Sequence, residues 1–180
     1  MTVICYRDGI LAADRLITDG YSVRAGRESK IFKRNSAFYG FSGSRGDIAR
    51  YCDWLFGPAL LDQVPTLTEG ISCIRVNAEG VAYGGGKPPV LLKLEAPFLS
   101  IGSGSHIALG AMWMGATAEQ AVQAAIALET ECGGPIDVLR CVEETLVAAQ
   151  QPQPLVGQIN PSPIRDPYQE IMGTHFGGPR

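Results

Sequence analysis

The first fourteen residues of the chain, MTVICYRDGILAAD (Met1–Asp14), decide the fold. Apolar runs on both sides of Asp8-Gly9 predict a β-hairpin, because Asp-Gly between two such runs is a strong signal for a two-residue turn. Chain ends are usually loose unless something ties them down. A buried strand that starts so early leaves two interpretations of Thr2. It is a β-forming residue at the edge of the sheet, or, once Met1 is removed, a nucleophile whose own amine serves as its base.

The composition is that of an ordinary globular protein of 180 residues, with 46% hydrophobic and 18% charged residues. A net charge of −3 gives no general attraction to nucleic acid or to an anionic membrane surface. No apolar run approaches the roughly 20 residues that span a bilayer, and the first residues lack the pattern of a signal peptide. We therefore expect neither nucleic acid nor membrane as a partner.

Cysteine and histidine usage narrows the chemistry. The five cysteines are scattered and odd in number, which indicates a cytoplasmic protein without a disulfide framework. The two histidines, His106 and His175, are too few for a metal site built on several imidazoles. We expect no metal and no cofactor, and if the chain is a hydrolase, its base is not expected to be histidine.

Hairpins, helices and a final strand follow one another along the chain. A second hairpin is predicted over 30–43, turning near Asn35-Ser36, and further strands fall within 71–86 and 90–104. Helices are expected over 44–56, 105–114 and 117–129, and a last strand within 136–148. Antiparallel hairpins with clustered helices favour an α+β domain over a doubly wound parallel sheet.

Two helix starts carry capping signals. Ser44 or Asp47 is a candidate cap for the first helix, and Thr117 with Gln120 forms a capping-box pattern before the third. The expected apolar face of the first helix comprises Ile48, Ala49, Cys52, Leu55 and Phe56. From about Gln150 the chain is rich in Pro, Gly and Gln, so we divide it into a domain over 1–149 and a tail over 150–180.

Polar residues that interrupt the apolar pattern have ordinary explanations when each is taken alone. Asp14 suits a turn at the end of a strand, Lys30 an exposed strand edge, and Gly43 a plain strand-to-helix turn. The glycines of "IGSGSHIALG" match neither the dinucleotide-binding nor the P-loop spacing, so they are a weak phosphate-binding signal.

Taken in order, these residues resemble a known family. Thr2, Asp14, Lys30, "GFSGS", "IGSGS" and "ETECGG" are together similar to the proteasome β-subunit and its bacterial HslV-type relatives, which are N-terminal nucleophile hydrolases. The resemblance covers about residues 2–147, including the 16-residue interval from Asp14 to Lys30. It implies a four-layer αββα sandwich of two antiparallel sheets flanked by helices.

The resemblance also implies a catalytic set. Thr2 is the nucleophile and its freed α-amine the general base, while Lys30, held by Asp14, lowers the effective pKa of the hydroxyl. The N–H of Gly43 receives the oxyanion. An α-amine has an ordinary pKa of about 7.7–8.0, and a neighbouring ammonium lowers it further. A protein short of histidine thus obtains a base of suitable strength, and the early start of the strand is explained.

Five further residues complete the implied site. Ser103 corresponds to the serine beside the nucleophile's amine, and Glu129 with Cys132 matches the family's D-x-x-S-G-G pattern. Thr18, four residues past the aspartate, is carried over as a substrate-binding residue. Phe41 takes the position that floors the pocket for the residue preceding the cleaved bond, which predicts a shallow apolar pocket unsuited to large aromatic side chains.

Four features depart from the family pattern. The first hairpin is shorter, which places the chain nearer compact bacterial or phage-borne relatives. Glu129 stands where Asp is usual, and Cys132 where Ser is usual. Val3 follows Thr2 where a second Thr is common.

Three functions remain open at this point. The first is a threonine peptidase that cleaves polypeptides inside a self-assembled homo-oligomeric ring, with an ATP-dependent unfoldase partner left open. The second is an amidase for a small amide, working without a ring. The third is a catalytically inactive structural subunit, although such subunits tend to lose the Thr or the Lys that this chain retains. Removal of Met1, oligomer size and the preferred substrate separate these functions.

Overall fold

The computed structural model describes residues 2–18, 26–57 and 64–141. All of them belong to the first of the two units into which the chain divides, Met1–Val147. The expected boundary at residue 149, the tail and the end of the last predicted strand lie outside the described residues. The elements in chain order are β1 (Ile4–Arg7), β2 (Ile10–Asp14), β3 (Leu16–Ile17), β4 (Gly26–Arg27), β5 (Ile31–Arg34), β6 (Ala37–Gly43), α1 (Arg45–Phe56), β7 (Ile71–Asn77), β8 (Gly80–Gly86), β9 (Leu92–Leu94), β10 (Phe98–Ile101), α2 (Ser105–Trp113), α3 (Ala118–Leu128) and β11 (Ile136–Arg140).

The first sheet is built around the N-terminal hairpin. Its strand order is β10-β1-β2-β11, and every neighbouring pair is antiparallel. Asp8 and Gly9 both have positive φ angles, of 50° and 74°, as a type I′ turn requires. The hairpin predicted from Asp8-Gly9 is therefore confirmed, and β1 occupies a central position in the sheet.

The second sheet has the order β5-β6-β7-β8-β9, again with antiparallel neighbours. Its first hairpin turns at Asn35 and Ser36, whose φ angles are 49° and 61°, and this confirms the second predicted hairpin. Strands β3 and β4 form a separate two-stranded ribbon in which Leu16 lies opposite Arg27.

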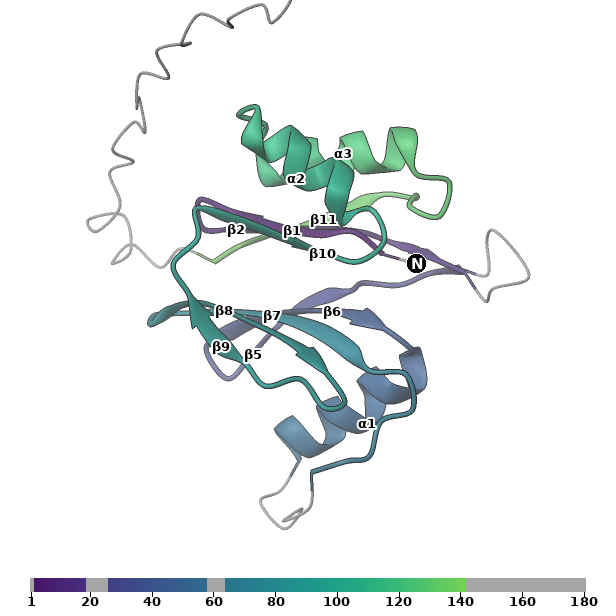
Figure 1. The fold of residues 1–180 in the computed structure, drawn as a ribbon, viewed down its shortest axis with the longest axis vertical. Coiled ribbons are helices and arrows are strands. Elements are labelled where there is room, and N and C mark those ends of the chain that lie inside the picture. Colours follow the sequence, from purple (N-terminus) through teal and green to yellow (C-terminus); the bar gives the residue numbers. More distant parts are fainter. Residues whose placement is uncertain (1, 19–25, 58–63, 142–180) are drawn as a thin grey trace, which may run out of the picture. The chain divides into compact units, whose positions relative to one another are not determined.

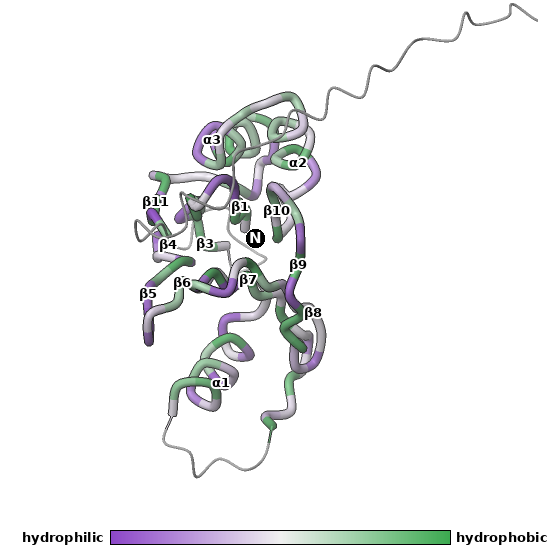
Figure 2. The backbone as a smooth tube through the Cα atoms, turned by 90° about the vertical axis from the view of Figure 1, so that its left-hand side faces the viewer, coloured by the Kyte–Doolittle hydropathy of each residue, from purple (hydrophilic) through white to green (hydrophobic). Residues whose placement is uncertain are grey.

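The two sheets lie face to face, with helices on their outer faces. Figure 1 shows α2 and α3 over the first sheet and α1 beneath the second, and Figure 2 shows the same order after a quarter turn. The alternating side chains of β1 explain this packing, since successive residues of a strand point to opposite faces. Val3 and Cys5 pack against α2 and α3, while Ile4 and Tyr6 pack against the second sheet.

Helix α1 begins where it was predicted, and most of its predicted apolar face packs against the core, but its cap differs from the prediction. Ser44 is the N-cap residue, yet its side chain makes no capping hydrogen bond. Asp47 is not a cap either: its fully buried carboxylate accepts hydrogen bonds from the backbone N–H groups of Thr68 (3.0 Å) and Glu69 (2.8 Å). The prediction is confirmed for four residues of the apolar face, which are partly buried against the core: Ile48, Cys52, Leu55 and Phe56. Ala49 is exposed instead, and the most deeply buried residues of the helix are Asp47 and Tyr51.

Helix α3 begins with the predicted capping box. The Gln120 N–H donates to Thr117 Oγ1 at 3.2 Å, and the Thr117 N–H donates to Gln120 Oε1 at 2.9 Å. This helix supplies the small buried residues Ala121 and Ala125, which allow it to approach the first sheet closely. In the described ranges, no helix is long and apolar enough to cross a membrane.

We predict that Asp47 ties the loop before β7 to α1. Hydrogen bonds from Thr68 and Glu69 lower the pKa of the Asp47 carboxyl below its ordinary value of 3.8. A lowered pKa stabilises the folded state above the unfolded pKa, and this contribution is lost as the pH falls through the folded pKa. Asp47→Asn should therefore lower Tm at neutral pH, and the difference from the wild type should shrink in strong acid.

The measurement is Tm as a function of pH for both proteins. Asp53→Asn is the control, because Asp53 is an exposed carboxylate on the same helix. A difference between wild type and Asp47→Asn that is the same at every pH would contradict a role for the charge.

Candidate active site

Asp14, the last residue of β2, is the centre of the site's hydrogen bonding. Its side chain is fully buried, and Oδ1 accepts from the Val3 N–H at 2.9 Å. Oδ2 accepts from the N–H groups of Leu16 (3.2 Å) and Gly133 (3.1 Å). A buried carboxylate is costly unless it is paired and hydrogen-bonded, and here three separate segments supply its donors. The carboxylate therefore fixes the head of β1, the start of β3 and the turn before β11 relative to one another.

Lys30 completes the environment of this carboxylate. Its Nζ lies 2.7 Å from Asp14 Oδ1, and the side chains of both residues are largely buried. Burial lowers the pKa of the Lys30 ammonium below its ordinary value, while the adjacent Asp14 carboxylate opposes that shift. The Lys30 carbonyl accepts a hydrogen bond from the Phe41 N–H at 3.2 Å, and this bond joins the residue before β5 to β6. Lys30 is therefore not the exposed strand-edge residue that it resembles when considered alone, and the Asp14 side chain is fully buried.

Thr2 is nearly buried at the head of β1 and is enclosed by the turn between β10 and α2. Its N–H donates to Ser103 Oγ at 3.3 Å, and its carbonyl accepts from the Gly104 N–H at 3.3 Å. This nitrogen is amide-bonded to Met1 in the full chain, so it stands where the freed amine would stand. A hydroxyl partner is thus in place for that amine.

Gly102 explains why this turn is rich in glycine. Its φ angle is +96°, and a Cβ built on it would lie 2.1 Å from the Thr2 carbonyl oxygen. A Cβ on Gly104 would lie 2.8 Å from the sulfur of Cys132. The glycines of "IGSGS" therefore allow the backbone to close around Thr2, and phosphate binding is not needed to explain them.

Cys132 contacts Ser103 directly, whereas Glu129 contacts Cys132. The Ser103 hydroxyl hydrogen-bonds the buried Cys132 sulfur, and burial, foremost, raises the pKa of this thiol. Glu129 ends α3 at its C-cap, and its backbone carbonyl accepts from the Cys132 N–H at 3.1 Å. No hydrogen bond among the described residues joins the Glu129 carboxylate to Thr2 or Ser103.

A pocket of about 360 Å³ opens beside Thr2. Five residues predicted for the site line it: Thr2, Thr18, Lys30, Phe41 and Gly43. Of the remaining predicted residues, Asp14 contacts Lys30, Ser103 contacts Thr2 and Cys132 contacts Ser103. Glu129 is joined to them only through its backbone hydrogen bond with Cys132. The fold thus brings five of the predicted residues around one cavity and links the others to them, from segments up to 130 residues apart in the chain.

Phe41 and Phe32 give this pocket an aromatic wall. The Phe41 ring stacks on those of Phe32 and Tyr39, with ring centres 5.8 and 6.2 Å apart, and meets Tyr51 edge-on at 6.0 Å. Phe41 is almost fully buried, so it cannot swing away without disrupting the core between β6 and α1.

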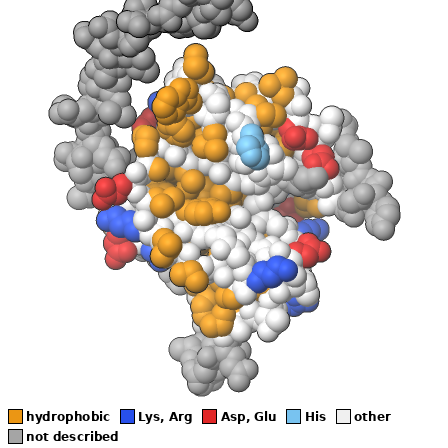
Figure 3. Space-filling model, viewed as in Figure 1, with side chains coloured by type: hydrophobic (Ala, Val, Ile, Leu, Met, Phe, Trp, Pro, Cys, Tyr) orange, Lys and Arg blue, Asp and Glu red, His pale blue; other side chains and the backbone are white. Residues whose placement is uncertain are grey.

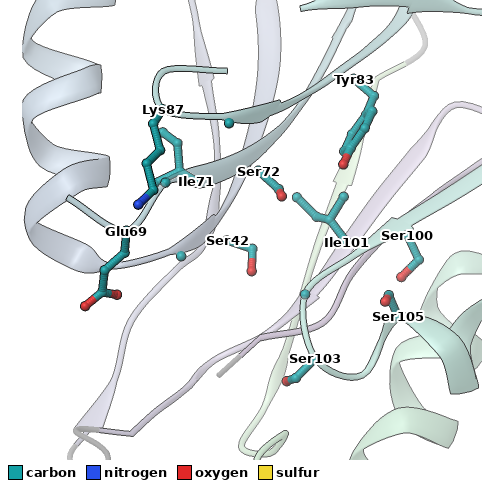
Figure 4. Close-up of a pocket in the computed structure, with 14 residues that line it drawn as sticks. Ser42, Glu69, Ile71, Ser72, Tyr83, Lys87, Ser100, Ile101, Ser103 and Ser105 are labelled. Carbon is teal, nitrogen blue, oxygen red and sulfur yellow. The ribbon is translucent and has the colours of Figure 1, made fainter. Parts of the chain in front are cut away.

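A second pocket, of about 620 Å³, adjoins the first at Gly43. Figure 4 shows its lining side chains, most of which carry hydroxyl groups. Ser103 belongs to this pocket, whereas Thr2 belongs to the first one, and the hydrogen bond between them crosses the boundary. Gly43 itself has a φ angle of +138°, and a Cβ there would lie 2.8 Å from the Gly70 carbonyl oxygen.

Two glycines that sequence reasoning did not single out contribute to the site. Gly102 permits the close approach to Thr2, and Gly133 binds Asp14 through its N–H while its carbonyl accepts from Leu16. The motifs "IGSGS" and "ETECGG" contained both, but a single sequence does not show which backbone each glycine approaches. Within the described ranges, no three His, Cys, Asp or Glu side chains gather as metal ligands.

We predict that Gly102→Ala destabilises the protein, whereas Gly110→Ala does not. A side chain at Gly102 faces an unfavourable φ worth about 1–3 kcal/mol, in addition to the clash with Thr2. Gly110 lies inside α2 with nothing within 4 Å of a built Cβ, so alanine there should gain about 0.5–1 kcal/mol. Urea unfolding of both variants measures the two effects, and an equal stability of the two variants would contradict the enclosure of Thr2.

Comparisons with known proteins give a result at the level of the fold. No family model and no curated protein matches the chain. Among solved structures, BPH of Thiobacillus denitrificans matches with a TM-score of 0.56 and 20% identity, covering 79% of this chain and 99% of that one. The same protein in complex with epoxomicin matches with a TM-score of 0.52 and 21% identity, with the same coverage. Eukaryotic HslV from Trypanosoma brucei matches with a TM-score of 0.54 and 20% identity, covering 77% and 97%. The chain therefore has an HslV-type fold, in agreement with the resemblance drawn from its motifs.

Proposed function

We propose that the protein is a threonine peptidase whose nucleophile is Thr2 after removal of Met1. The observation that carries the proposal is the shared pocket: Thr2 and Lys30 line one cavity, and Lys30 is held there by the fully buried Asp14 carboxylate. The HslV-type fold supports this interpretation. At the finer level we assign the fold to the four-layer αββα sandwich of N-terminal nucleophile hydrolases, in a compact bacterial or phage-borne form.

The first half of the reaction forms an acyl-enzyme. The freed α-amine of Thr2 takes the hydroxyl proton, and Oγ1 attacks the carbonyl carbon of the substrate's peptide bond. The resulting oxyanion is bound by the Gly43 N–H. The bond to the substrate nitrogen then breaks, the amine returns its proton to that nitrogen, and an ester joins the acyl half to Thr2. Water repeats the sequence in the second half and releases the acid.

Lys30 acts on this chemistry through its charge. An ammonium beside the nucleophile favours the developing alkoxide and disfavours a protonated α-amine, so both groups stay in their reactive states. The Asp14 carboxylate keeps the Lys30 ammonium in place. The hydrogen bonds that Asp14 accepts from the backbone prevent the carboxylate itself from moving toward Thr2. Ser103 orients the amine, and Cys132 holds the Ser103 hydroxyl from behind. We assign Glu129 a supporting electrostatic role at the same end of the site.

Exposed apolar side chains support assembly into a homo-oligomeric ring around a polypeptide substrate. Leu109, Trp113 and Met114 are exposed along and just after α2, and Val90 and Leu92 lie exposed around the start of β9. Figure 3 shows hydrophobic side chains gathered on this face of the molecule. Contiguous apolar surface of this kind marks protein–protein contacts. We place the protein in the cytoplasm because all five cysteines are free thiols, and we include an ATP-dependent unfoldase as a candidate partner.

The first test is intact-mass spectrometry before and after treatment with a threonine-directed epoxyketone. We expect loss of the Met1 mass, followed by a single stoichiometric adduct that is absent from Thr2→Ala. Lys30→Met should slow adduct formation by about 10²–10³-fold, the size of effect seen when one electrostatic stabilising group is removed.

Folding and processing of each variant are checked by Tm and by the mass of the untreated protein. A chain that keeps Met1 and forms no adduct would overturn the peptidase and favour an inactive structural subunit. An adduct on a monomer that hydrolyses small amides but no peptides would favour the amidase.

Phe41 should set the preference for the residue that precedes the cleaved bond. We expect small apolar residues to be cleaved in preference to Phe, because the stacked Phe41 ring closes the pocket floor. Phe41→Ala should raise kcat/KM for a Phe substrate relative to an Ala substrate by at least about tenfold, since pocket contacts of this size are worth 1–3 kcal/mol.

Phe38→Ala is the matched control, because Phe38 lies on the same strand but packs into the core between the two sheets. Fluorogenic peptides that differ in this one residue provide the measurement. If Phe41→Ala keeps the wild-type preference for the residue before the cleaved bond, that residue does not bind in the pocket lined by Phe41.

A further inference from the structure

The larger of the two pockets is a polar cavity, and of its lining residues the proposed mechanism uses only Gly43 and Ser103. Six hydroxyl-bearing side chains line it, contributed by β6, β7, β8, β10 and the turn into α2. They are Ser42, Ser72, Tyr83, Ser100, Ser103 and Ser105. The pocket beside Thr2 differs in kind, since Leu16, Phe32, Phe41, Ile48 and Ala49 are among the residues that line it.

Two of the six hydroxyls already form hydrogen bonds within the protein. Ser100 Oγ donates to the Ile4 carbonyl at 3.0 Å, and Ser103 Oγ is the partner of the Thr2 N–H. The hydroxyls of Ser42, Ser72, Tyr83 and Ser105 take part in no hydrogen bond within the described part of the chain. These four hydroxyls can therefore serve a bound molecule.

Strand register places two of these hydroxyls side by side. Ser42 and Ser72 are directly opposite each other on β6 and β7. Figure 4 shows them on the same side of the pocket, with the Tyr83 hydroxyl directed into it from β8. Since a hydroxyl both donates and accepts, this arrangement matches an amide or a hydroxyl group.

The charged residues that line the pocket favour neither an anionic nor a cationic ligand. Glu69 and Lys87 both lie on the same side of the cavity in Figure 4, and they carry opposite charges. The Lys87 ammonium is bonded to the Thr68 carbonyl at 2.5 Å. An apolar side chain of a ligand would displace water from the four hydroxyls that have no partner in the described part of the protein. The hydrogen bonds from that water would not be replaced, which is unfavourable. The chemistry therefore selects a polar, uncharged side chain.

The position of the pocket indicates which part of a substrate it holds. Gly43 lines both pockets, and the Thr2–Ser103 hydrogen bond lies at their boundary. A carbonyl held at the Gly43 N–H thus has an apolar cavity on one side and the hydroxyl-lined cavity on the other. With the acyl half in the Phe41 pocket, the amine half is directed into the polar one.

We infer that the hydroxyl-lined pocket beside Gly43 binds the amine side of the cleaved bond and selects a polar, uncharged residue there, such as Ser, Thr, Asn or Gln. This inference rests on the proposed peptidase function. It names the substrate class as a peptide with a small apolar residue before the cleaved bond and a polar, uncharged residue after it.

Capture of the acyl-enzyme by added amines tests the pocket directly. The enzyme is acylated by a fluorogenic peptide amide, and serine amide, asparagine amide or leucine amide is added. The amine nitrogen attacks the ester carbonyl, a C–N bond forms, the C–O bond to Thr2 breaks, and the nitrogen's proton returns through the α-amine to Oγ1. Mass spectrometry then gives the ratio of captured peptide to hydrolysed acid.

We expect serine and asparagine amides to be captured about tenfold better than leucine amide. The double variant Ser72→Ala/Tyr83→Phe should lower that preference about five- to tenfold, because it removes two hydrogen-bonding groups. Thr66→Ala, which removes an exposed hydroxyl outside both pockets, should leave the preference unchanged.

Each other result has a distinct meaning. No hydrolysis by the wild type would overturn the proposed peptidase itself. Hydrolysis with better capture of leucine amide, or with a preference that survives in the double variant, would overturn the inference and leave the peptidase standing. A double variant that changes KM for the acyl-side residues would assign the pocket to the other half of the substrate, which also overturns it.

Discussion

The buried carboxylate of Asp14 is the constraint on which the rest of the site depends. A charge removed from water requires a full set of partners, and those of Asp14 come from Val3, Leu16, Gly133 and Lys30. These residues belong to four separate segments of the chain. Satisfying one carboxylate therefore brings the strand that follows Thr2, the β3–β4 ribbon, the turn before β11 and Lys30 into a single arrangement. The same bonds that stabilise the fold hold the reactive groups in register.

Close backbone approach is the second requirement of the site. The turn at Gly102 lies so near the Thr2 carbonyl that a side chain would overlap it, and Gly43 is similarly pressed against Gly70. The loop that contains Gly70 is fixed from below by Asp47 and from the side by Lys87. The proposed oxyanion donor is thus supported by contacts that do not themselves touch the substrate. This support explains why a buried acidic residue in α1 is used for anchoring a loop rather than for capping its own helix.

The division of the cleft follows from the two faces of β6. The side chain of Phe41 packs with the aromatic core toward α1 and lines one pocket, while Ser42 points to the other side and lines the second. Because alternate residues of a strand face opposite directions, one short stretch supplies an apolar wall, a polar wall and the glycine between them. Three consecutive residues, Phe41 to Gly43, thereby line both pockets, and in the proposed peptidase they would contact the substrate on both sides of the cleaved bond.

Local chemistry in the sequence determined the hairpins at Asp8-Gly9 and Asn35-Ser36 and the capping box at Thr117, because each depends on residues a few positions apart. The motif order also identified the residues that meet at the site. Tertiary structure alone decided the rest. Asp47 was misassigned as a candidate cap since its partners lie 21 and 22 residues away. The burial of Lys30 against Asp14, the role of Gly102 and the hydroxyl-lined pocket depend on strands from distant parts of the chain meeting in space, and no local pattern encodes such contacts.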